Sequence, residues 1–466
     1  MKFLCFDDWL FHRVRNLTRR YHQPVWRDEH ILIEPNAYGA SGASVAPAPG
    51  GGYYLYYFSI AENRSNPDDA LAFLMARSDD GLRWERMRET DGAPPPRDPR
   101  SGGSVFYDPD DADPARRYKA TVMLDTATLG GRAPRPGEPH DASQSAGYLK
   151  YSPDGLRWTV EPRHVYFRGL SDTTMTLLRN PVTGCFQVMV RAGLGNRRIF
   201  QVESRDLETW TRPRLVLHPC PPDPRGRLFY GMPQFRYGDM FLGFLQIYQT
   251  TDEDPGMGRM AGAVTTELAF SYNGRYWMRT YQPFLPLRER GTYGGGSMYG
   301  EAFLDPGGDS LLVYAGAAIE EHHRALDRDP AAPPLTGILP GTLRRDGFVG
   351  LATTAGPGEV STYQLALAAD SELCLNVKAP YGGVRVQLAD EVYGPIPGYT
   401  YEECEEIRGD FTCVRPRWRR QTTLHEAKRR SPYLRIQVRL DQAELYSLSF
   451  NMGGNPYVKG AEESGR

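Results

Sequence analysis

The stretch YSPDGLRW, residues 151–158, has the form of a tight turn between two β-strands. Pro presets one backbone angle and Gly adopts angles that other residues avoid, so Pro-Asp-Gly favours a turn. The chain repeats this stretch: SDDGLRW ends at Trp84, SRDLETW at Trp210 and SYNGRYW at Trp277. A fainter fifth copy, RRDGFVGL, covers 344–351 with Phe348 in place of the tryptophan. We call these stretches the marker turns.

A second repeated unit precedes each of the five copies. It consists of an apolar run, a turn rich in Gly, Pro and Asp, and an aromatic-rich run, which is the pattern of a β-hairpin. The five units cover 42–59, 102–124, 173–191, 232–248 and 296–316. Each unit and its marker turn predict four antiparallel strands. One such sheet cannot cover both of its faces, whereas a ring of them can, so the repeats predict a five-bladed β-propeller. The marker Asp and Trp then have structural roles.

The sequence changes character after the fifth unit. Short alternating strands without a marker turn follow, among them ELCLNVKA, VRVQLAD and YLRIQVRL, which is typical of a β-sandwich. We therefore predict an all-β chain with three parts. Residues 1–33 form an N-terminal extension that packs on the propeller or the sandwich, 34–345 form the propeller, and 346–466 form the sandwich.

The composition excludes several classes of function. A formal net charge of −2 over 466 residues gives no electrostatic reason to bind nucleic acid or an anionic membrane. No glycine-rich loop follows a strand and opens a helix, so we expect no nucleotide cofactor. The six cysteines are scattered without a C-x-x-C pair, so we expect them to be reduced, with no metal site. With no apolar leader at the start, we expect a cytoplasmic protein.

Five marked blades followed by a sandwich resemble the five-bladed-propeller glycoside hydrolases, both the arabinanase/xylosidase-like and the invertase/levanase-like groups. Three stretches resemble a poorly characterised bacterial branch of that superfamily: FDDWL at 6–10, VFYDPDDADPARRYKA at 105–120 and YGMPQFRYGDMFLGFLQIY at 230–248. The resemblance implies a carbohydrate or a glycosylated small molecule as substrate. The chain departs from the invertase-like pattern, because Glu34-Pro35-Asn36 stands where that group has its nucleophile motif and the hairpin spacing puts Ser41 or Gly42 at the strand position.

The predicted blades place chemistry on one face. In a blade, the start of the innermost strand, the end of the second strand and the loop from the second to the third strand share a rim. Four of these loops are long and charged, at 61–70, 126–144, 250–263 and 317–337, and a short one lies near Gly193. Long loops on one rim of a rigid scaffold are the usual place for a binding site.

Propeller glycosidases use two carboxylates, one as general acid and the other as base or nucleophile. Asp172 opens the inner strand of the third blade and is our first catalytic candidate, although it also fits a local backbone cap. Asp125 ends the second strand of the second blade and fits a solvated loop residue equally. Glu320 follows the second strand of the fifth blade, where a polar first turn of a helix is the alternative.

Five further residues on this rim are candidates for substrate binding: Glu62, Arg191, Tyr230, His322 and His323. Arg191 could hold an anionic substituent or form a structural ion pair, and Tyr230 could stack on a sugar ring. The imidazoles could bind sugar hydroxyls or transfer protons. Glu301 is an acid inside an inner strand, which is unexpected unless it faces the channel or a partner.

Two hypotheses from different classes follow. The first is a glycoside hydrolase acting on a furanoside or a related glycan through paired carboxylates. The second is a non-hydrolytic propeller, either a sugar-binding module or a scaffold recruited to another reaction in a biosynthetic pathway. The residues leave open the substrate, the stereochemistry and the oligomeric state.

Overall fold

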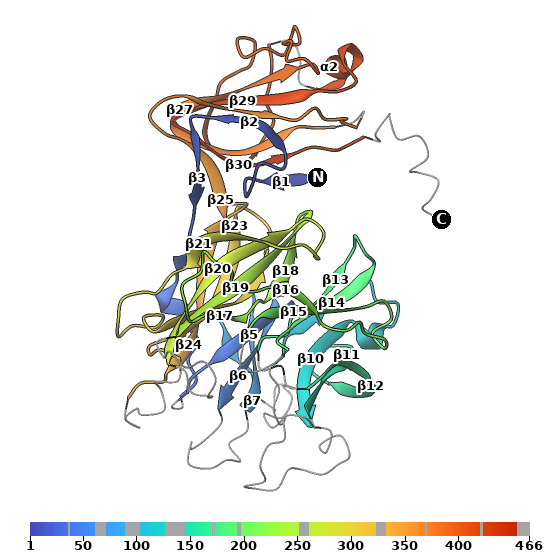
Figure 1. The fold of residues 1–466 in the computed structure, drawn as a ribbon, viewed down its shortest axis with the longest axis vertical. Helices are drawn as coiled ribbons and strands as arrows, with labels where there is room; N and C mark the ends of the chain where they lie inside the picture. The colour runs from blue at the N-terminus through green and yellow to red at the C-terminus, as the bar shows by residue number, and fades with distance from the viewer. Residues whose placement is uncertain are drawn as a thin grey trace. The chain divides into compact units, whose positions relative to one another are not determined.

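Figure 1 shows the computed structural model of the chain. It describes residues 1–35, 38–60, 71–88, 103–125, 145–169, 171, 173–192, 197–250, 261–322, 332–368, 371–419 and 423–453, with the backbone alone at 60, 71, 72 and 125. The protein is all-β, and within these ranges the α-helical element is the short α2 (His425–Arg430). Two 3₁₀ turns, η1 (Asp28–His30) and η3 (Pro114–Arg116), also occur. No helix in the described ranges is long and apolar enough to cross a membrane.

The chain divides into two compact units. Unit 1 consists of 1–23 and 344–466, and unit 2 of 24–343. Unit 2 contains three four-stranded antiparallel sheets, which we number as strand groups 1 to 3. Group 1 has β5 (Ser41–Pro47), β6 (Tyr53–Ile60), β7 (Leu71–Ser78) and β8 (Glu85–Arg86); group 2 has β9 (Val105–Tyr107), β10 (Tyr118–Asp125), β11 (Ser145–Ser152) and β12 (Thr159–Arg168); group 3 has β13 (Leu177–Asn180), β14 (Cys185–Val190), β15 (Ile199–Ser204) and β16 (Arg214–Leu217).

A nine-stranded sheet completes unit 2 and consists of two antiparallel runs. A single parallel pair, Val264 with Ser297, joins them. Group 4 has β17 (Arg227–Gly231), β18 (Gln234–Tyr237), β19 (Met240–Thr250), β20 (Gly262–Ser271) and β21 (Met278–Leu285); group 5 has β22 (Ser297–Leu304), β23 (Ser310–Ala318), β24 (Thr336–Arg344) and β4 (Val25–Trp26).

The fourth strand of group 5 corrects the expected fifth marker. β4 comes from the start of the chain and pairs with β24 through Gly341 and Trp26. The strand after RRDGFVGL's turn, β25 (Val349–Thr353), pairs instead with β3 and β30 in unit 1. The fifth copy therefore lies in unit 1, directly after the end of unit 2, which a faint sequence repeat cannot reveal.

The four clear marker turns share one hydrogen-bond pattern. In YSPDGLRW, the Ser152 hydroxyl accepts the backbone N–H groups of 154 and 155, and Asp154 Oδ1 accepts those of 156 and 157, all at 2.8 to 3.3 Å. Equivalent bonds form around Ser78, Ser204 and Ser271. The Trp158 indole N–H donates to the Gly155 carbonyl at 3.0 Å. The structural role predicted for the marker Asp is confirmed.

Neighbouring groups are joined through these turns. The Tyr56 hydroxyl of group 1 donates to Gly155 of group 2, and the Tyr314 hydroxyl of group 5 donates to Gly81 of group 1. Gln201 of group 3 donates to Gly274 of group 4. Separate hydrophobic clusters fill the spaces between groups 1 and 2, 2 and 3, 3 and 4, 4 and 5, and 5 and 1. Groups 1 and 5 are therefore neighbours although they are far apart in sequence.

Unit 1 is built around a second nine-stranded sheet. Its strands are β1 (Lys2–Leu4), β2 (Phe11–Arg15), β3 (Leu17–Tyr21), β25, β26 (Gly358–Thr362), β27 (Cys374–Ala389), β28 (Ile407–Val414), β29 (Arg435–Asp441) and β30 (Glu444–Ser449). The blue N-terminal strands β1 to β3 lie among the orange and red C-terminal strands (Figure 1), and β1 pairs with β30, β2 with β26, and β3 with β25.

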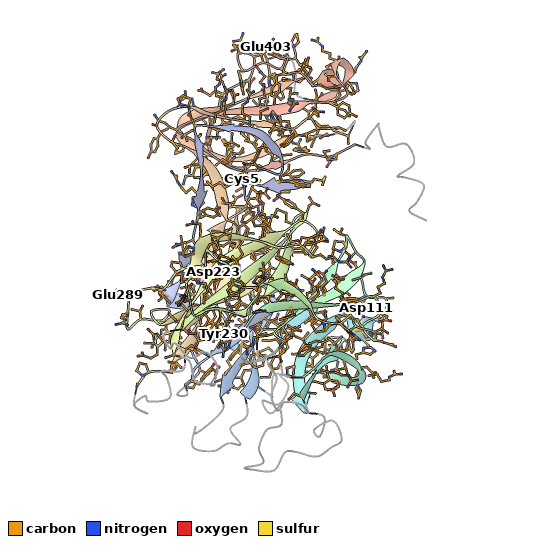
Figure 2. All side chains as sticks on the ribbon, in the orientation of Figure 1. Cys5, Asp111, Asp223, Tyr230, Glu289 and Glu403 are labelled. Carbon is orange, nitrogen blue, oxygen red and sulfur yellow. A yellow bond between two sulfur atoms is a disulfide. The ribbon has the colours of Figure 1, made fainter. Side chains whose placement is uncertain are left out.

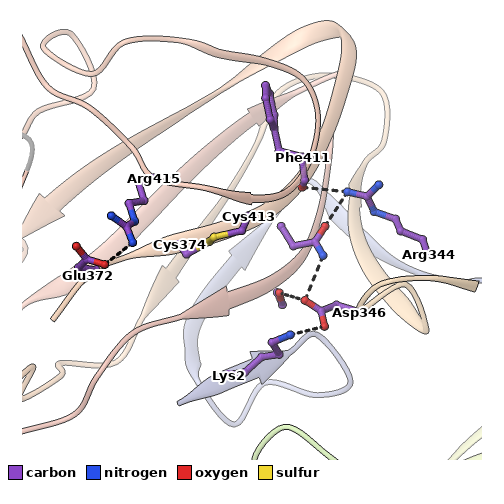
Figure 3. Close-up of a disulfide and its surroundings, with 10 residues drawn as sticks. Lys2, Arg344, Asp346, Glu372, Cys374, Phe411, Cys413 and Arg415 are labelled. Atoms are coloured by element: carbon purple, nitrogen blue, oxygen red, sulfur yellow. Dashed lines mark hydrogen bonds and ion pairs between the residues drawn. A yellow bond between two sulfur atoms is a disulfide. The ribbon is translucent and has the colours of Figure 1, made fainter. Parts of the chain in front are cut away.

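A disulfide corrects the expectation that all six cysteines are reduced. Cys374 of β27 is bonded to Cys413 of β28, with the two Cα atoms 5.5 Å apart (Figure 3). The residues are 39 positions apart in sequence, and antiparallel pairing of the two strands brings them together. Cysteine spacing alone cannot show such a pairing, because strand partners must be known first. The other four cysteines are free thiols.

Candidate functional site

Six residues from three strand groups gather at one place in unit 2, and we call them the Tyr230 cluster. Arg191 follows β14 and Arg197 precedes β15, so both come from group 3. Tyr230 lies on β17 and Tyr248 on β19 of group 4. Tyr299 lies on β22 and His322 follows β23 in group 5. Tyr230 lies within the body of unit 2, whereas Glu289 lies at its edge (Figure 2).

The aromatic members of the cluster pack edge to face around Tyr230. The ring centroid of Tyr230 lies 5.9 Å from Tyr248, 5.4 Å from Tyr299 and 5.0 Å from His322. Tyr248 is fully buried, and it joins Leu228 and Val264 in the apolar cluster beneath. Edge-to-face contacts of this kind fix ring orientation. The cluster is a preformed aromatic surface on a rigid base.

Two guanidinium groups approach the same tyrosine. Arg191 Cζ lies 5.3 Å from the Tyr230 centroid, and Arg197 Cζ lies 5.0 Å from the centroids of both Tyr230 and Tyr248. Arg191 is buried, with 2% of its surface exposed, and its Nη1 donates to the Tyr230 carbonyl at 3.1 Å. Cations over aromatic faces are favoured by the ring quadrupole. The described members of the cluster thus combine aromatic rings with two guanidinium groups.

Hydrogen bonds from its backbone and its side chain help to hold His322 in place. Its backbone N–H donates to the Gly262 carbonyl at 2.9 Å, and its Nδ1 shares a hydrogen bond of 3.1 Å with the Tyr299 hydroxyl. Burial raises the pKa of Tyr299 well above its ordinary value, so this phenol keeps its proton at neutral pH. The imidazole is oriented by the phenol, as a proton-transferring or hydroxyl-binding histidine must be.

The chain on either side of Asp172 is attached to this cluster. The Ser171 hydroxyl accepts the Arg191 backbone N–H at 2.9 Å, and the Thr173 hydroxyl donates to the Tyr230 carbonyl at 3.0 Å. Asp172 itself lies outside the described residues. Its two neighbours nevertheless connect the start of group 3 to both Arg191 and Tyr230.

A separate cavity of about 860 Å³ lies among strands from all five groups. Residues of β5, β9, β13, β18 and β22 line it, among them Arg179 of β13, together with Asp108 and Asp110. Glu301, one of the lining residues, is buried, with 4% of its surface exposed. Its carboxylate accepts the backbone N–H groups of Gly42 and Ala43, both at 2.8 Å, and the Ser41 hydroxyl at 3.1 Å.

Glu301 therefore links β22 of group 5 to β5 of group 1 by hydrogen bonds. Burial raises its pKa, and the three donors from β5 oppose that effect only partly. This arrangement explains an acid within an inner strand by its structural role. Glu34 is similarly engaged, because its carboxylate accepts the Tyr57 hydroxyl at 2.6 Å and pairs with Arg86 at 2.8 Å.

The structure brings together three of the eight predicted site residues: Arg191, Tyr230 and His322. Three others, Glu62, Asp172 and His323, lie outside the described residues. Asp125 ends β10 opposite Ser145, with only its backbone described, and Glu320 is exposed just beyond β23. Among the residues the structure describes, no group of three or more His, Cys, Asp and Glu side chains is placed to hold a metal ion.

Sequence reasoning missed Arg197, Tyr248 and Tyr299. Tyr248 and Tyr299 read as ordinary strand aromatics, and the cluster forms only when groups 4 and 5 lie side by side. Arg197 carried a usable signal, since it lies just after the short loop near Gly193 that the marker spacing places on the predicted rim.

Comparison with known proteins gives distant matches in structure only. No protein-family model matches the chain, and no curated protein matches it. An N-acetylgalactosamine deacetylase from F. plautii, solved with blood group B trisaccharide, is 16% identical with a TM-score of 0.43, over 70% of this chain and 95% of its own. A β-1,2-mannobiose phosphorylase from Listeria innocua is 14% identical with a TM-score of 0.44, over 69% of this chain and 97% of its own. A thermostable family-43 glycoside hydrolase is 15% identical with a TM-score of 0.44, over 69% of this chain and 95% of its own. Likenesses this distant do not assign a function to the chain.

Proposed function

We propose that the five strand groups of unit 2 are the blades of a five-bladed β-propeller, and that the sheet of unit 1 forms a β-sandwich. Five interfaces support this proposal, because each group packs on the next and group 5 returns to group 1. β4 would close the ring by supplying the last strand of group 5. Sharing a sheet between the two ends of a chain is an effective way to remove exposed edges.

We further propose that the protein is a carbohydrate-active enzyme of the glycoside hydrolase type, with its substrate site at the Tyr230 cluster. The observation that carries this proposal is the convergence of Arg191, Tyr230 and His322 at the rim where the long loops were predicted. Aromatic rings with adjacent hydrogen-bonding groups suit a sugar, which presents apolar ring faces and hydroxyl edges.

Asp172 is the proposed first carboxylate, because its two chain neighbours are bonded to Arg191 and Tyr230. Asp125 or Glu320 is the proposed partner. The acid would protonate the leaving oxygen while the second carboxylate activates water or attacks the sugar. Their separation, about 5 Å for retention or about 6.5–9.5 Å for inversion, would decide the stereochemical outcome.

The second candidate, a sugar-binding propeller without hydrolytic activity, is favoured by one observation. The described members of the Tyr230 cluster are aromatic or cationic, and Glu320, the one candidate acid with a described side chain, is exposed. A site of this composition can hold a sugar without cleaving it.

A screen of nitrophenyl glycosides and oligosaccharides with the full chain tests the first candidate. We expect turnover of at least one substrate and a loss of about 10²–10⁴-fold in kcat for Asp172→Asn, the size of an acid–base contribution. Asp79→Asn, an exposed acid in the first marker turn, is the matched control and should keep full activity. Equal turnover by wild type and Asp172→Asn would remove the lead residue. Sugar binding without turnover, abolished by Tyr230→Ala, would establish the second candidate.

A further inference from the structure

Arg197 is the least satisfied cation of the Tyr230 cluster. Its Nε and Nη1 atoms are buried, and neither makes a hydrogen bond. Among the residues the structure describes, no carboxylate lies within ion-pair distance of its guanidinium. Buried polar groups are normally hydrogen-bonded and buried charges are normally paired. A guanidinium without such partners therefore needs an explanation.

Packing on the tyrosines does not supply one. The faces of Tyr230 and Tyr248 attract the positive charge of Arg197, whose Cζ is 5.0 Å from each centroid. The N–H donors of a guanidinium, however, lie in its plane and require acceptor atoms. A ring face provides no such acceptor along an in-plane N–H. The Nε and Nη1 donors of Arg197 are therefore still without an acceptor in the structure.

A second guanidinium group lies beside the same ring. Arg191 Cζ lies 5.3 Å from the same Tyr230 centroid, so two guanidinium groups lie around one ring. Both positive charges would attract an anion bound at this ring. Guanidinium groups favour carboxylates and phosphates because the fork of N–H donors matches paired oxygens.

We propose that Arg197, with Arg191 beside it, binds the carboxylate of an anionic sugar, a hexuronic acid residue of the substrate. The inference rests on the sugar site proposed above and specifies its substrate class. The tyrosines and His322 contact the uncharged part of the sugar, and the guanidinium groups contact its carboxylate. A free phosphate ion presents the same oxygen pairs, so it is a separate arm of the test.

The test is calorimetric titration of the full chain with D-glucuronate, D-glucose and inorganic phosphate at low ionic strength. Glucuronate and glucose differ only in the carboxylate, so the site should bind glucuronate at least tenfold more tightly, and added salt should weaken that binding. Arg197→Gln should lower the glucuronate affinity at least tenfold and so remove the preference for glucuronate over glucose. Arg197→Lys should restore part of the loss. Arg212→Gln, an exposed arginine of group 3, is the control and should match the wild type.

Equal affinity for glucuronate and glucose, or unchanged glucuronate binding by Arg197→Gln, would overturn the proposal. Binding of phosphate but not glucuronate, lost in Arg197→Gln, would also overturn it by assigning the site to a free oxyanion. Thermal unfolding of each variant checks that the chain is folded. If Arg197→Gln does not fold, Arg197→Lys, which keeps the positive charge but loses the fork of donors, takes its place in the test. This test measures binding, and the test of the hydrolase proposal measures turnover. If Asp172→Asn kept full activity, the hydrolase proposal would lose its lead residue, but the glucuronate binding result would be unaffected.

Discussion

The marker turns give a prediction whose size can be worked out from the structure. Asp154→Ala removes the oxygen that accepts the backbone N–H groups of Leu156 and Arg157, at 3.0 and 2.9 Å. It also removes the ion pair with Arg157, at 2.7 Å, whose arginine is 83% exposed. The ion pair contributes at most about 0.5 kcal/mol at such a position.

The backbone contacts dominate the expected loss. An Asp that caps two N–H groups in a turn is comparable to a helix N-cap, whose removal costs about 1 kcal/mol and at most about 2 kcal/mol. We therefore expect Asp154→Ala to lower the free energy of unfolding by about 1–2 kcal/mol. Asp154→Asn should lose less than half of that, because its side-chain oxygen still accepts, as Asn273 Oδ1 does in the fourth marker turn.

The protonation of Asp154 adds a pH test. Partial burial alone would raise the pKa of Asp154, but hydrogen bonds from the backbone of Arg157 and Leu156 outweigh it and lower the pKa to about 2. A depressed folded pKa means that the contribution is complete above the ordinary value near 4 and is lost as the pH falls towards 2.

Urea unfolding of the wild type, Asp154→Ala and Asp154→Asn between pH 2 and 7 measures both effects. The gap between wild type and Asp154→Ala should be constant at neutral pH and shrink below about pH 4. If the Asn variant were as unstable as the Ala variant, or the gap did not shrink with acid, the structural account of the marker Asp would be wrong.

Four further predictions concern other features of the fold. Glu301→Ala leaves three donors of β5 without their acceptor and should lower the free energy of unfolding by about 2–3 kcal/mol in urea titrations; a loss below about 0.5 kcal/mol would contradict its role in joining groups 5 and 1. Burial raises the pKa of Glu301 in the folded state. The wild type should therefore lose stability relative to Glu301→Gln as the pH rises from about 4.5 through the folded pKa. If the free energies of unfolding of the two proteins changed in parallel with pH, the raised pKa would be wrong. Leu207 has a φ of +67°, so Leu207→Gly relieves about 1 kcal/mol of strain. It also deletes a side chain that is only 2% exposed, which costs about 2–4 kcal/mol, so calorimetry should show a net loss rather than a gain. Reduction of the Cys374–Cys413 bond opens a loop of 39 residues and should destabilise unit 1 by up to about 4 kcal/mol; an unchanged melting temperature with dithiothreitol would refute that.

Much of the fold follows from local sequence signals. A marker turn is specified within seven residues, since Ser152, Asp154 and Gly155 make their contacts with one another and with the next two residues. The hairpins before each marker follow from alternation and turn residues in the same local way. The all-β class and the four-stranded repeats could therefore be predicted from the sequence.

The features that sequence reasoning missed all depend on distant contacts. β4 is two residues long and pairs with a strand more than 300 residues away, so no pattern identifies it. The disulfide depends on the register of β27 with β28. Tyr248, Tyr299 and Arg197 become site candidates only because three strand groups converge. The sequence could predict three members of the cluster, because the marker spacing located the ends of their strands: Arg191, Tyr230 and His322.

The central claim is that sugar binds at the Tyr230 cluster, and the position of a bound ligand tests it most directly. A crystal structure of the full chain with D-glucuronate should show the sugar in contact with Tyr230 and His322, with its carboxylate within hydrogen-bond distance of Arg197. Ligand density instead in the cavity of about 860 Å³ beside Glu301, or on unit 1, would contradict the account.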